Sequence, residues 1–202
     1  MYVVCLDLES ILVPEIWVSV AEKKNIPELR LTTRDIPDYD LLMKKRMDIL
    51  KSHNIKLVDI QKVIKDMEPF EGAVEFLKWL RERCQVVILS GSFYEFVMPL
   101  MEKINYPTIF CNQLDVDENN CINNYVIRQN NGKKESVKAL KSLGFKVVVV
   151  GDSYNDTDML EAADAGILFN ASDKMKKEFS QFASVNNYQE LKTVLREYVS
   201  KE

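Results

Sequence analysis

The chain has 202 residues and a formal net charge of −4, and 47% of its residues are hydrophobic while 29% are charged. These values are ordinary for one globular domain, or for one domain that carries an insert. The acidic balance argues against broad nucleic-acid binding, and no apolar run reaches the roughly 18 residues that a membrane-spanning helix requires.

The first third of the chain predicts one strand and then only helices. Residues 2–6 are apolar and form the first expected strand. Apolar residues then recur at helical spacing, and the expected helices cover residues 15–25, 39–53 and 57–67. We therefore expect a small helical cap of residues 15–68, inserted into a core that consists of residues 1–14 and 69–202.

The rest of the chain alternates strands with helices. Further strands are expected at residues 85–89, 108–111, 147–150 and 165–169, and helices at residues 73–83, 93–104, 133–143 and 156–163. The expected hairpin comprises residues 114–116 and 121–127, and two short helices and a strand near residues 183–185 end the chain. This alternation predicts an α/β fold with a doubly wound, mostly parallel, Rossmann-like sheet.

The cysteines and the N-terminal residues indicate in which cellular compartment the protein is expected. The four cysteines lie far apart and show no spacing typical of a metal or redox site, which indicates reduced, mostly structural thiols. The chain begins directly with strand residues, without the pattern of a signal peptide. We therefore expect a cytoplasmic protein with no membrane or nucleic-acid partner. The sequence leaves the oligomeric state open, a homodimer included.

Acidic residues directly follow two of the expected strands. Asp7 and Glu9 come after the first strand, and Asp152 and Asp156 come after four consecutive valines and Gly151. If these strands are parallel neighbours, their carboxyl ends meet at one edge of the sheet and the acids share a small volume. Like charges so close repel, and an all-oxygen set suits a hard cation. The sequence therefore predicts a Mg²⁺ site, although each acid alone could be a helix cap or a solvated turn residue.

Two of these acids are candidates for covalent chemistry at phosphorus. Asp7 is the candidate nucleophile, because a carboxylate can attack phosphorus and form an aspartyl-phosphate that water then cleaves. Glu9 lies two residues later, on the same side of an extended chain. It could protonate the leaving oxygen and then activate water, and the alternative is a solvated glutamate in a turn.

Small and basic residues supply candidate phosphate ligands. Ser90 and Gly91 lie between an expected strand and an expected helix, where a hydroxyl and backbone N–H groups at a helix start can hold phosphate. Lys133 and Lys134 open another expected helix, and one ammonium there could neutralise phosphate. The alternatives are a simple helix cap and a solvated lysine, and the choice between the two lysines stays open.

The expected cap contributes two charged candidates. Glu15 could bind an ammonium group and Arg46 a carboxylate, so that together they would hold a zwitterion. Charged residues on helices are more often simply solvated, and the spacing alone does not decide whether Glu15 and Arg46 bind a ligand or face solvent.

With these residues in order, the chain resembles the haloacid dehalogenase superfamily of phosphatases. The four motifs of that family match residues 7–9, Ser90, Lys133 and residues 151–156. Within the family, the chain is similar to the phosphoserine phosphatase branch, including those members that also transfer the phosphoryl group to homoserine. The stretches that carry this closer resemblance are residues 6–9, 12–17, 32–40, 93–96 and 151–156.

The resemblance implies a haloacid dehalogenase fold and a Mg²⁺-dependent hydrolase of serine biosynthesis that cleaves O-phospho-L-serine through an aspartyl-phosphate on Asp7. It implies that Glu9 is the acid/base, and that Asp7, the carbonyl of Glu9 and Asp152 hold Mg²⁺, with Asp156 close behind. The substrate-binding residues that it implies are Ser90, Gly91 and Lys133 for the phosphoryl group, Glu15 and Arg46 for the amino-acid end, and Asn155.

Three alternatives stay open at this point. The first is phosphoryl transfer to homoserine, although residues 90–92 are nearer to ordinary phosphoserine phosphatases than to the bifunctional members, which have an acidic residue and a threonine after the serine. The second is a phosphatase for another small phosphorylated metabolite. The third, from another class, is a non-catalytic protein that binds a phosphorylated ligand, which the four intact motifs disfavour.

Overall fold

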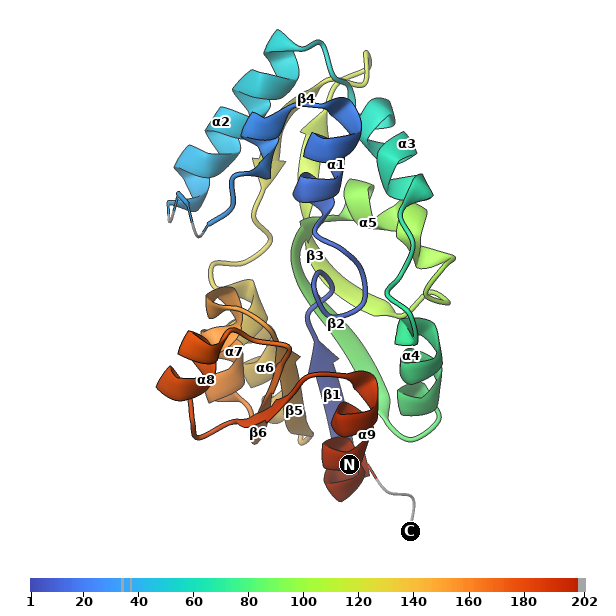
Figure 1. Cartoon of the computed structure of the whole chain (residues 1–202), viewed down its shortest axis with the longest axis vertical. Coiled ribbons are helices and arrows are strands. Elements are labelled where there is room, and N and C mark those ends of the chain that lie inside the picture. The colour runs from blue at the N-terminus through green and yellow to red at the C-terminus, as the bar shows by residue number, and fades with distance from the viewer. Residues whose placement is uncertain (34, 37, 200–202) are drawn as a thin grey trace.

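The computed structural model describes residues 1–33, 35–36 and 38–199 (Figure 1). Arg34 and Pro37, which belong to the resembling stretch 32–40, and residues 200–202, which belong to the expected core, lie outside the described residues.

One mixed sheet forms the centre of the molecule (Figure 1). Its strands are β1 (Tyr2–Leu6), β2 (Gln85–Phe93), β3 (Thr108–Val116), β4 (Ile122–Val126), β5 (Lys146–Gly151), β6 (Ala165–Phe169) and β7 (Ala183–Val185). Among the described residues their order is β4-β3-β2-β1-β5-β6-β7, and all neighbours pair in parallel except β3 and β4. The predicted α/β fold with a mostly parallel sheet is confirmed.

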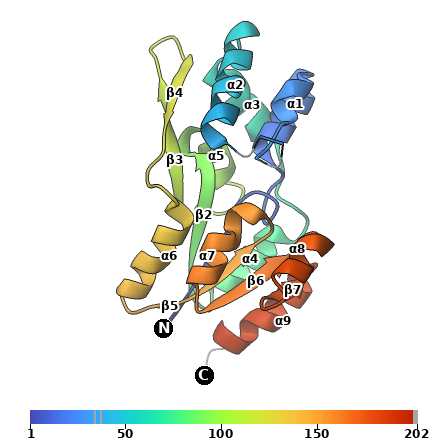
Figure 2. The same ribbon diagram turned by 90° about the vertical axis from the view of Figure 1, so that its left-hand side faces the viewer.

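Helices cover both faces of this sheet (Figure 2). They are α4 (Ala73–Arg81), α5 (Tyr94–Met101), α6 (Gly132–Ser142), α7 (Thr157–Ala162), α8 (Asp173–Glu178) and α9 (Tyr188–Val199), with a 3-10 turn η2 (Tyr154–Asp156). Val148 packs in the same apolar cluster as α4 and α9, while its neighbour Val149 packs in a second cluster with α6, α7 and α8. Successive side chains of β5 therefore enter opposite cores, which explains the uninterrupted run of valines.

All the secondary-structure elements named between β1 and α4 are helices. They are α1 (Ile16–Lys24), the 3-10 helix η1 (Pro27–Arg30), α2 (Tyr39–Ser52) and α3 (Leu57–Asp66). Asn25 ends α1 in the left-handed conformation, with φ 54°, and Asp38 caps α2 by accepting from the N–H of Leu41 at 3.0 Å. These helices stand beyond the carboxyl ends of β1 and β5 (Figure 1).

The β3–β4 hairpin runs alongside this helical segment (Figure 2). The ring of Tyr125 on β4 packs edge-on against Tyr39 of α2 at 5.8 Å between centroids, and its hydroxyl bonds to Asp40. The N–H of Leu57, the first residue of α3, donates to the carbonyl of Asn120 in the hairpin turn at 3.0 Å. The hairpin belongs to the expected core of residues 69–202, and these contacts show that it also borders α2 and α3.

The predicted end of the second strand is wrong. We expected residues 90–92 to connect a strand to a helix, but β2 continues to Phe93 and α5 begins at Tyr94. Phe93 is 1% exposed and packs edge-on against Phe96. Because this ring must enter the core, the chain stays extended through Ser90 and Gly91 instead of turning at once into a helix.

Among the described residues, no helix is both long and apolar enough to cross a membrane. The four cysteines are free thiols, as the sequence indicated, and Cys5 lies buried in β1. Burial raises the pKa of the Cys5 thiol, so this group stays protonated and inert in the core.

Candidate active site

The carboxyl ends of β1 and β5 bring the predicted acids together. The strands are parallel neighbours with Leu6 opposite Val150, and the N–H of Asp7 donates to the carbonyl of Val150 at 3.1 Å. Asp7 and Asp152 thus leave the sheet at the same edge. Together with Asp156 they offer carboxylate oxygens that all lie within 4.8 Å of one another.

Asp156 is held by the backbone of its own loop. It is fully buried, and its Oδ2 accepts from the N–H of Asp152 at 3.0 Å and from the N–H of Ser153 at 3.2 Å. A Cβ atom on Gly151 would lie only 2.5 Å from the Cβ of Asp156. Glycine at the end of β5 therefore allows the loop to fold back, and the loop fixes the carboxylate.

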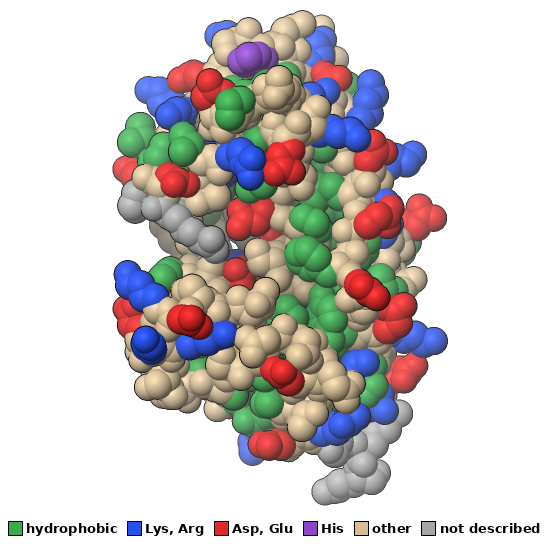
Figure 3. Space-filling model, viewed as in Figure 1, with side chains coloured by type: hydrophobic (Ala, Val, Ile, Leu, Met, Phe, Trp, Pro, Cys, Tyr) green, Lys and Arg blue, Asp and Glu red, His purple; other side chains and the backbone are tan. Residues whose placement is uncertain are grey.

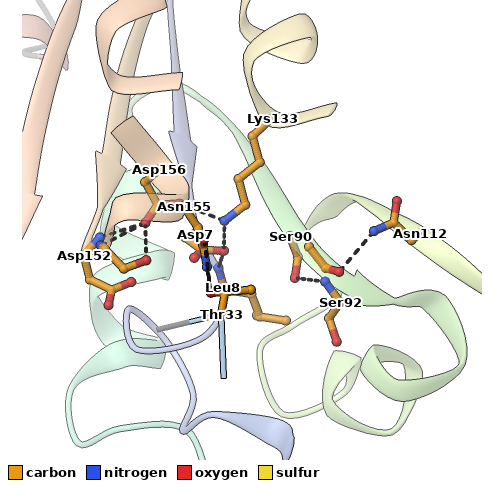
Figure 4. Close-up of polar contacts among 12 residues, drawn as sticks. Asp7, Leu8, Thr33, Ser90, Ser92, Asn112, Lys133, Asp152, Asn155 and Asp156 are labelled. Atoms are coloured by element: carbon orange, nitrogen blue, oxygen red, sulfur yellow. Dashed lines mark hydrogen bonds and ion pairs between the residues drawn. The ribbon is translucent and has the colours of Figure 1, made fainter. Parts of the chain in front are cut away.

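Lys133 reaches this acidic cluster from α6, as Figure 4 shows. Its Nζ lies 2.9 Å from Oδ1 of Asp7 and 2.8 Å from Oδ1 of Asp156. Lys134 instead pairs with Asp158 on the outside of α6, at 3.4 Å. Of the two lysines that the sequence left open, only Lys133 contacts the predicted acids.

Burial and charge act on these groups in opposite directions. Burial raises the pKa of Asp7 well above its usual value, Lys133 opposes that rise, and the charges of Asp156 and Asp152 add to it. For Lys133, burial alone would lower the pKa, but Asp156 and Asp7 outweigh it and the net pKa is raised. The ammonium is therefore charged at neutral pH and stabilises the ionised form of Asp7.

The acidic cluster suits a divalent cation. Three carboxylates face one ammonium, so negative charge is in excess when all of them are ionised. Oxygen donors without histidine or cysteine are the ligands that Mg²⁺ prefers. Asp156 already accepts hydrogen bonds at both oxygens, so its carboxylate is less available for direct ligation. The residues present thus fit the predicted ion.

Glu9 lines the same pocket but is not one of the three clustered carboxylates. Its Oε2 accepts from the N–H of Ile16, the first residue of α1, at 2.8 Å. Burial raises the pKa of Glu9, the Ile16 hydrogen bond opposes the rise, and the charge of Glu15 adds to it. The carboxylate of Glu9 is therefore outside the described acidic cluster, and ligation through the Glu9 carbonyl stays a prediction.

A single pocket of about 380 Å³ lies between the sheet edge and the cap helices. Figure 3 shows the surface hollowed between these two parts, with acidic side chains at the hollow. Of the predicted site residues, all except the buried Asp156 line this pocket: Asp7, Glu9, Glu15, Arg46, Ser90, Gly91, Lys133, Asp152 and Asn155. The fold thus brings the candidates from residues 15–68 and the candidates from the rest of the chain to the walls of one pocket.

Ser90 and Gly91 line the same pocket, and Figure 4 shows Ser90 on β2, away from the helix that carries Lys133. The Oγ of Ser90 accepts from the N–H of Ser92 at 3.1 Å. The carbonyl of Gly91 accepts from Nδ2 of Asn112 at 3.1 Å. These two bonds hold the extended chain where β2 departs from regular pairing with β3.

Arg46 is the most unusual group at the cap end of the pocket. It is 6% exposed, its guanidinium lies 4.6 Å from the ring centroid of Trp17, and its Nη2 donates to the carbonyl of Leu31 at 2.8 Å. Its Nε is buried without a hydrogen-bond partner in the part of the chain that the structure describes. Burial lowers the pKa of Arg46 to about 10, so the group is still charged at neutral pH. A buried cation with an unpartnered donor is costly, and an anionic ligand would satisfy it.

Glu15 and Asn155 also line the pocket. Glu15 precedes α1 but makes no side-chain capping bond there. Asn155 donates from Nδ2 to Oγ1 of Thr33 at 3.1 Å, which connects the loop after β5 to the segment between η1 and α2. Asn155 thus bonds to the segment before α2, in addition to its place in the pocket wall.

Sequence reasoning assigned no role to several residues of the pocket. Trp17 lies on an apolar helix face, which indicated a core side chain. Thr33 lies in a polar loop, where no apolar periodicity points to a role. Tyr39 lines the pocket from the first turn of α2.

Known proteins share this sequence and this fold. Residues 14–164 match a family model described as a haloacid dehalogenase-like hydrolase. A phosphoserine phosphatase of Pseudomonas syringae pv. tomato is 56% identical over 190 residues, which cover 94% of this chain and 80% of that protein. The phosphoserine phosphatase ThrH of Pseudomonas aeruginosa is 55% identical over 192 residues, which cover 95% of this chain and 94% of that protein.

Solved structures agree with the sequence comparison. The crystal structure of a phosphoserine phosphatase in apo form superposes with a TM-score of 0.78 at 25% identity, and the match covers 98% of this chain and 99% of that one. A substrate-bound phosphoserine phosphatase complex superposes with a TM-score of 0.72 at 25% identity, covering 97% of each chain.

Proposed function

The chain belongs to the haloacid dehalogenase-like hydrolase family, and we propose that it hydrolyses O-phospho-L-serine to L-serine and phosphate through an aspartyl-phosphate on Asp7. One observation carries the proposal furthest. A single pocket holds a carboxylate paired with Lys133 at one end and the buried, incompletely bonded guanidinium of Arg46 at the other. The names of the two Pseudomonas relatives support the choice of substrate.

The first chemical step forms the covalent intermediate. An oxygen of Asp7 attacks phosphorus, and the bond between phosphorus and the serine oxygen breaks. Glu9 transfers its proton to that departing oxygen. The burial that raises the pKa of Glu9 favours the protonated form that this step requires. Ser90, Gly91 and Lys133 hold the phosphoryl oxygens, since they line the pocket around Asp7.

The second step restores the enzyme. Water attacks phosphorus of the aspartyl-phosphate, Glu9 accepts the proton of that water, and the bond between phosphorus and Asp7 breaks. Phosphate leaves and Asp7 regains its carboxylate, with Lys133 again 2.9 Å away in the resting state.

Asp7, the carbonyl of Glu9 and Asp152 would hold Mg²⁺, and Asp156 would orient Lys133 and the loop behind them. When bound, the ion would neutralise charge on the phosphoryl oxygens and help to align them with Asp7. Without it, a phosphate dianion would meet an excess of negative charge at this edge of the sheet.

The cap end of the pocket recognises the amino acid. Arg46 binds the carboxylate and uses its Nε, while Glu15 binds the ammonium group. Trp17 and the carbonyl of Leu31 keep the guanidinium in place before the substrate arrives. In this proposal residues 15–68 act as a cap on a core of residues 1–14 and 69–202, and Asn155 contacts the substrate at their border.

A second candidate is transfer of the phosphoryl group to homoserine. It needs the same intermediate, with an alcohol in place of water in the second step. The resemblance of residues 12–17 and 93–96 to bifunctional members of the branch favours it. Residues 90–92 favour hydrolysis, because they match ordinary phosphoserine phosphatases more closely.

Phosphate release from O-phospho-L-serine in the presence of Mg²⁺ tests the proposal. We expect release by the wild type, loss of release with Asp7→Asn, and loss on chelation of the metal. No release by the wild type would exclude phosphoserine, and a panel of other phosphate esters would follow. Addition of homoserine, with chromatography of the products, distinguishes the two acceptors: phosphohomoserine appears only if transfer occurs.

A further inference from the structure

We propose that Asn112 is a positioning residue, which holds the bulge of β2 at Ser90–Ser92 in its phosphate-binding geometry and ties it to the segment that carries Lys133. The inference rests on the proposed function, since it concerns the phosphate end of the same pocket. It adds a residue to which neither the motifs nor the pocket wall assign a role.

The bulge creates backbone groups that regular pairing does not serve. Leu89 of β2 lies opposite Phe110 of β3, and Phe93 lies opposite Asn112. Three residues of β2 therefore lie opposite a single residue of β3. The bulge turns Ser90 toward the pocket, and its backbone groups need partners other than the ladder.

Asn112 supplies one of these partners through its side chain. Its Nδ2 donates to the carbonyl of Gly91 at 3.1 Å. Its Oδ1 accepts from the backbone N–H of Arg128 at 3.1 Å. Because a carbonyl only accepts and an N–H only donates, these two partners fix the orientation of the amide.

The contact with Arg128 continues to the start of α6. The guanidinium of Arg128 donates from Nη2 to Oγ of Ser136 at 3.0 Å. That hydroxyl donates in turn to the carbonyl of Gly132 at 2.6 Å. Gly132 is the first residue of α6 and directly precedes Lys133. A chain of hydrogen bonds thus connects the bulge on one side of the phosphate position to the lysine on the other.

Asn112 lies behind the phosphate position and does not face the substrate. It lines a second, smaller pocket of about 190 Å³, together with Ser90, Gly91 and Lys133, which line both pockets. Asn112 is absent from the wall of the pocket that contains Asp7 and Arg46. It therefore acts through Gly91 and Arg128.

Packing does not replace this hydrogen bond. A Cβ atom added to Gly91 would meet no heavy atom within 4 Å, so no neighbour confines the bulge from that side. Without the Asn112 amide, Gly91 is free to shift, and a misplaced backbone donor loses much of its value for an oxyanion. We expect the affinity for phosphate to fall about tenfold when the hydrogen bond is lost.

The test uses two variants at this position. Asn112→Asp keeps the size of the side chain and an acceptor for Arg128, but the ionised carboxylate does not donate to Gly91. Asn112→Ala removes both bonds. The matched controls are Asn124→Asp and Asn124→Ala, on the exposed part of β4 in the same hairpin. Calorimetry with Mg²⁺ measures the dissociation constant of inorganic phosphate, and steady-state kinetics give kcat and KM.

We expect about tenfold weaker phosphate binding and about tenfold lower kcat/KM in both Asn112 variants, with unchanged melting temperatures and unchanged controls. Wild-type affinity in either Asn112 variant would overturn the inference, and so would an equal loss in the controls. If Asn112→Ala does not fold, Asn112→Asp decides alone.

The proposed function and this inference fail in different ways. A wild type that binds phosphate but does not hydrolyse phosphoserine refutes the proposed substrate, while the ratio of phosphate affinities still decides the role of Asn112. A wild type that binds no phosphate with Mg²⁺ would overturn both.

Discussion

The two ends of the pocket differ in how completely their charges are bonded. At the sheet edge, Lys133 lies between Asp7 and Asp156, and Asp156 also accepts bonds from its own loop. At the cap end, Arg46 is also buried, but its Nε has no hydrogen-bond partner among the described residues. In the proposed function, the charges at the sheet end are paired before the substrate binds, and the Nε of Arg46 gains its partner from the substrate.

The difference follows from what holds each group in place. Backbone geometry fixes the sheet end, through the β1–β5 ladder and the loop that folds back over Gly151. Side-chain contacts with Trp17 and Met43 and one carbonyl hold the guanidinium at the cap end. Chemistry at phosphorus needs preorganised charge, while recognition of the amino acid benefits from a donor that only the correct ligand satisfies.

The largest expected effect is at the sheet end. Lys133→Met removes the ammonium between Asp7 and Asp156, and we expect kcat for phosphate release to fall about 10³-fold. Lys134→Met is the matched control, because Lys134 pairs with Asp158 and does not line the pocket that contains Asp7, so this variant should keep near wild-type activity. Equal losses in the two variants, measured by steady-state kinetics, would contradict the assignment of Lys133.

Arg46→Ala breaks the cap end alone. We expect kcat/KM for O-phospho-L-serine to fall about 100-fold, since a charge-assisted pair with the substrate carboxylate is lost. O-phosphoethanolamine has the ammonium group but no carboxylate, so its kcat/KM should be nearly unchanged. Arg30→Ala, at an exposed surface pair with Glu22, serves as control. A similar loss with both substrates would show that Arg46 supports the fold and does not read the carboxylate.

Gly151→Ala tests whether backbone geometry builds the sheet end. The added Cβ would lie 2.5 Å from the Cβ of Asp156, so the loop must shift. We expect the free energy of unfolding to fall by about 2 kcal/mol, as for other overpacked sites. In urea denaturation, Gly91→Ala should leave stability unchanged, because its Cβ meets no atom within 4 Å. Wild-type stability of Gly151→Ala would refute the close packing described here.

The smallest expected effect concerns the bond that joins the two ends. Thr33→Val removes the hydroxyl that bonds to Asn155 across the mouth of the pocket, at 3.1 Å. We expect KM for phosphoserine to rise about threefold with little change in kcat, as for loss of one exposed hydrogen bond. A large drop in kcat would mean that this bond orders the catalytic groups themselves.

The parts that sequence predicted well depend on local pattern. Four valines followed by Gly151 predict a strand buried on both faces, and acids after two such strands meet whenever the strands are parallel neighbours. The fold class and the juxtaposition of Asp7 with Asp152 required no more than that. The remaining site residues were found through their order in the family motifs, and their roles stay predictions.

Other features depend on tertiary contacts that no local pattern encodes. β2 runs past Ser90 because the ring of Phe93 is buried against Phe96, far from the expected strand end. Arg46 becomes a pocket residue because α1 places Trp17 beneath it. In the sequence, Asn112 is an ordinary polar residue near a predicted hairpin. Its hydrogen bond to Gly91 could not be predicted, because it depends on the bulge of β2 opposite Asn112.

The most direct test of the account is to locate the phosphoryl group on the protein. Wild-type enzyme with Mg²⁺ would be mixed rapidly with O-phospho-L-serine, quenched in acid and analysed by peptide mass spectrometry. The account predicts one phosphoryl group, on the peptide that contains Asp7, and none with Asp7→Asn. Phosphate release without this adduct, or an adduct on Ser90 or Ser92, would contradict it.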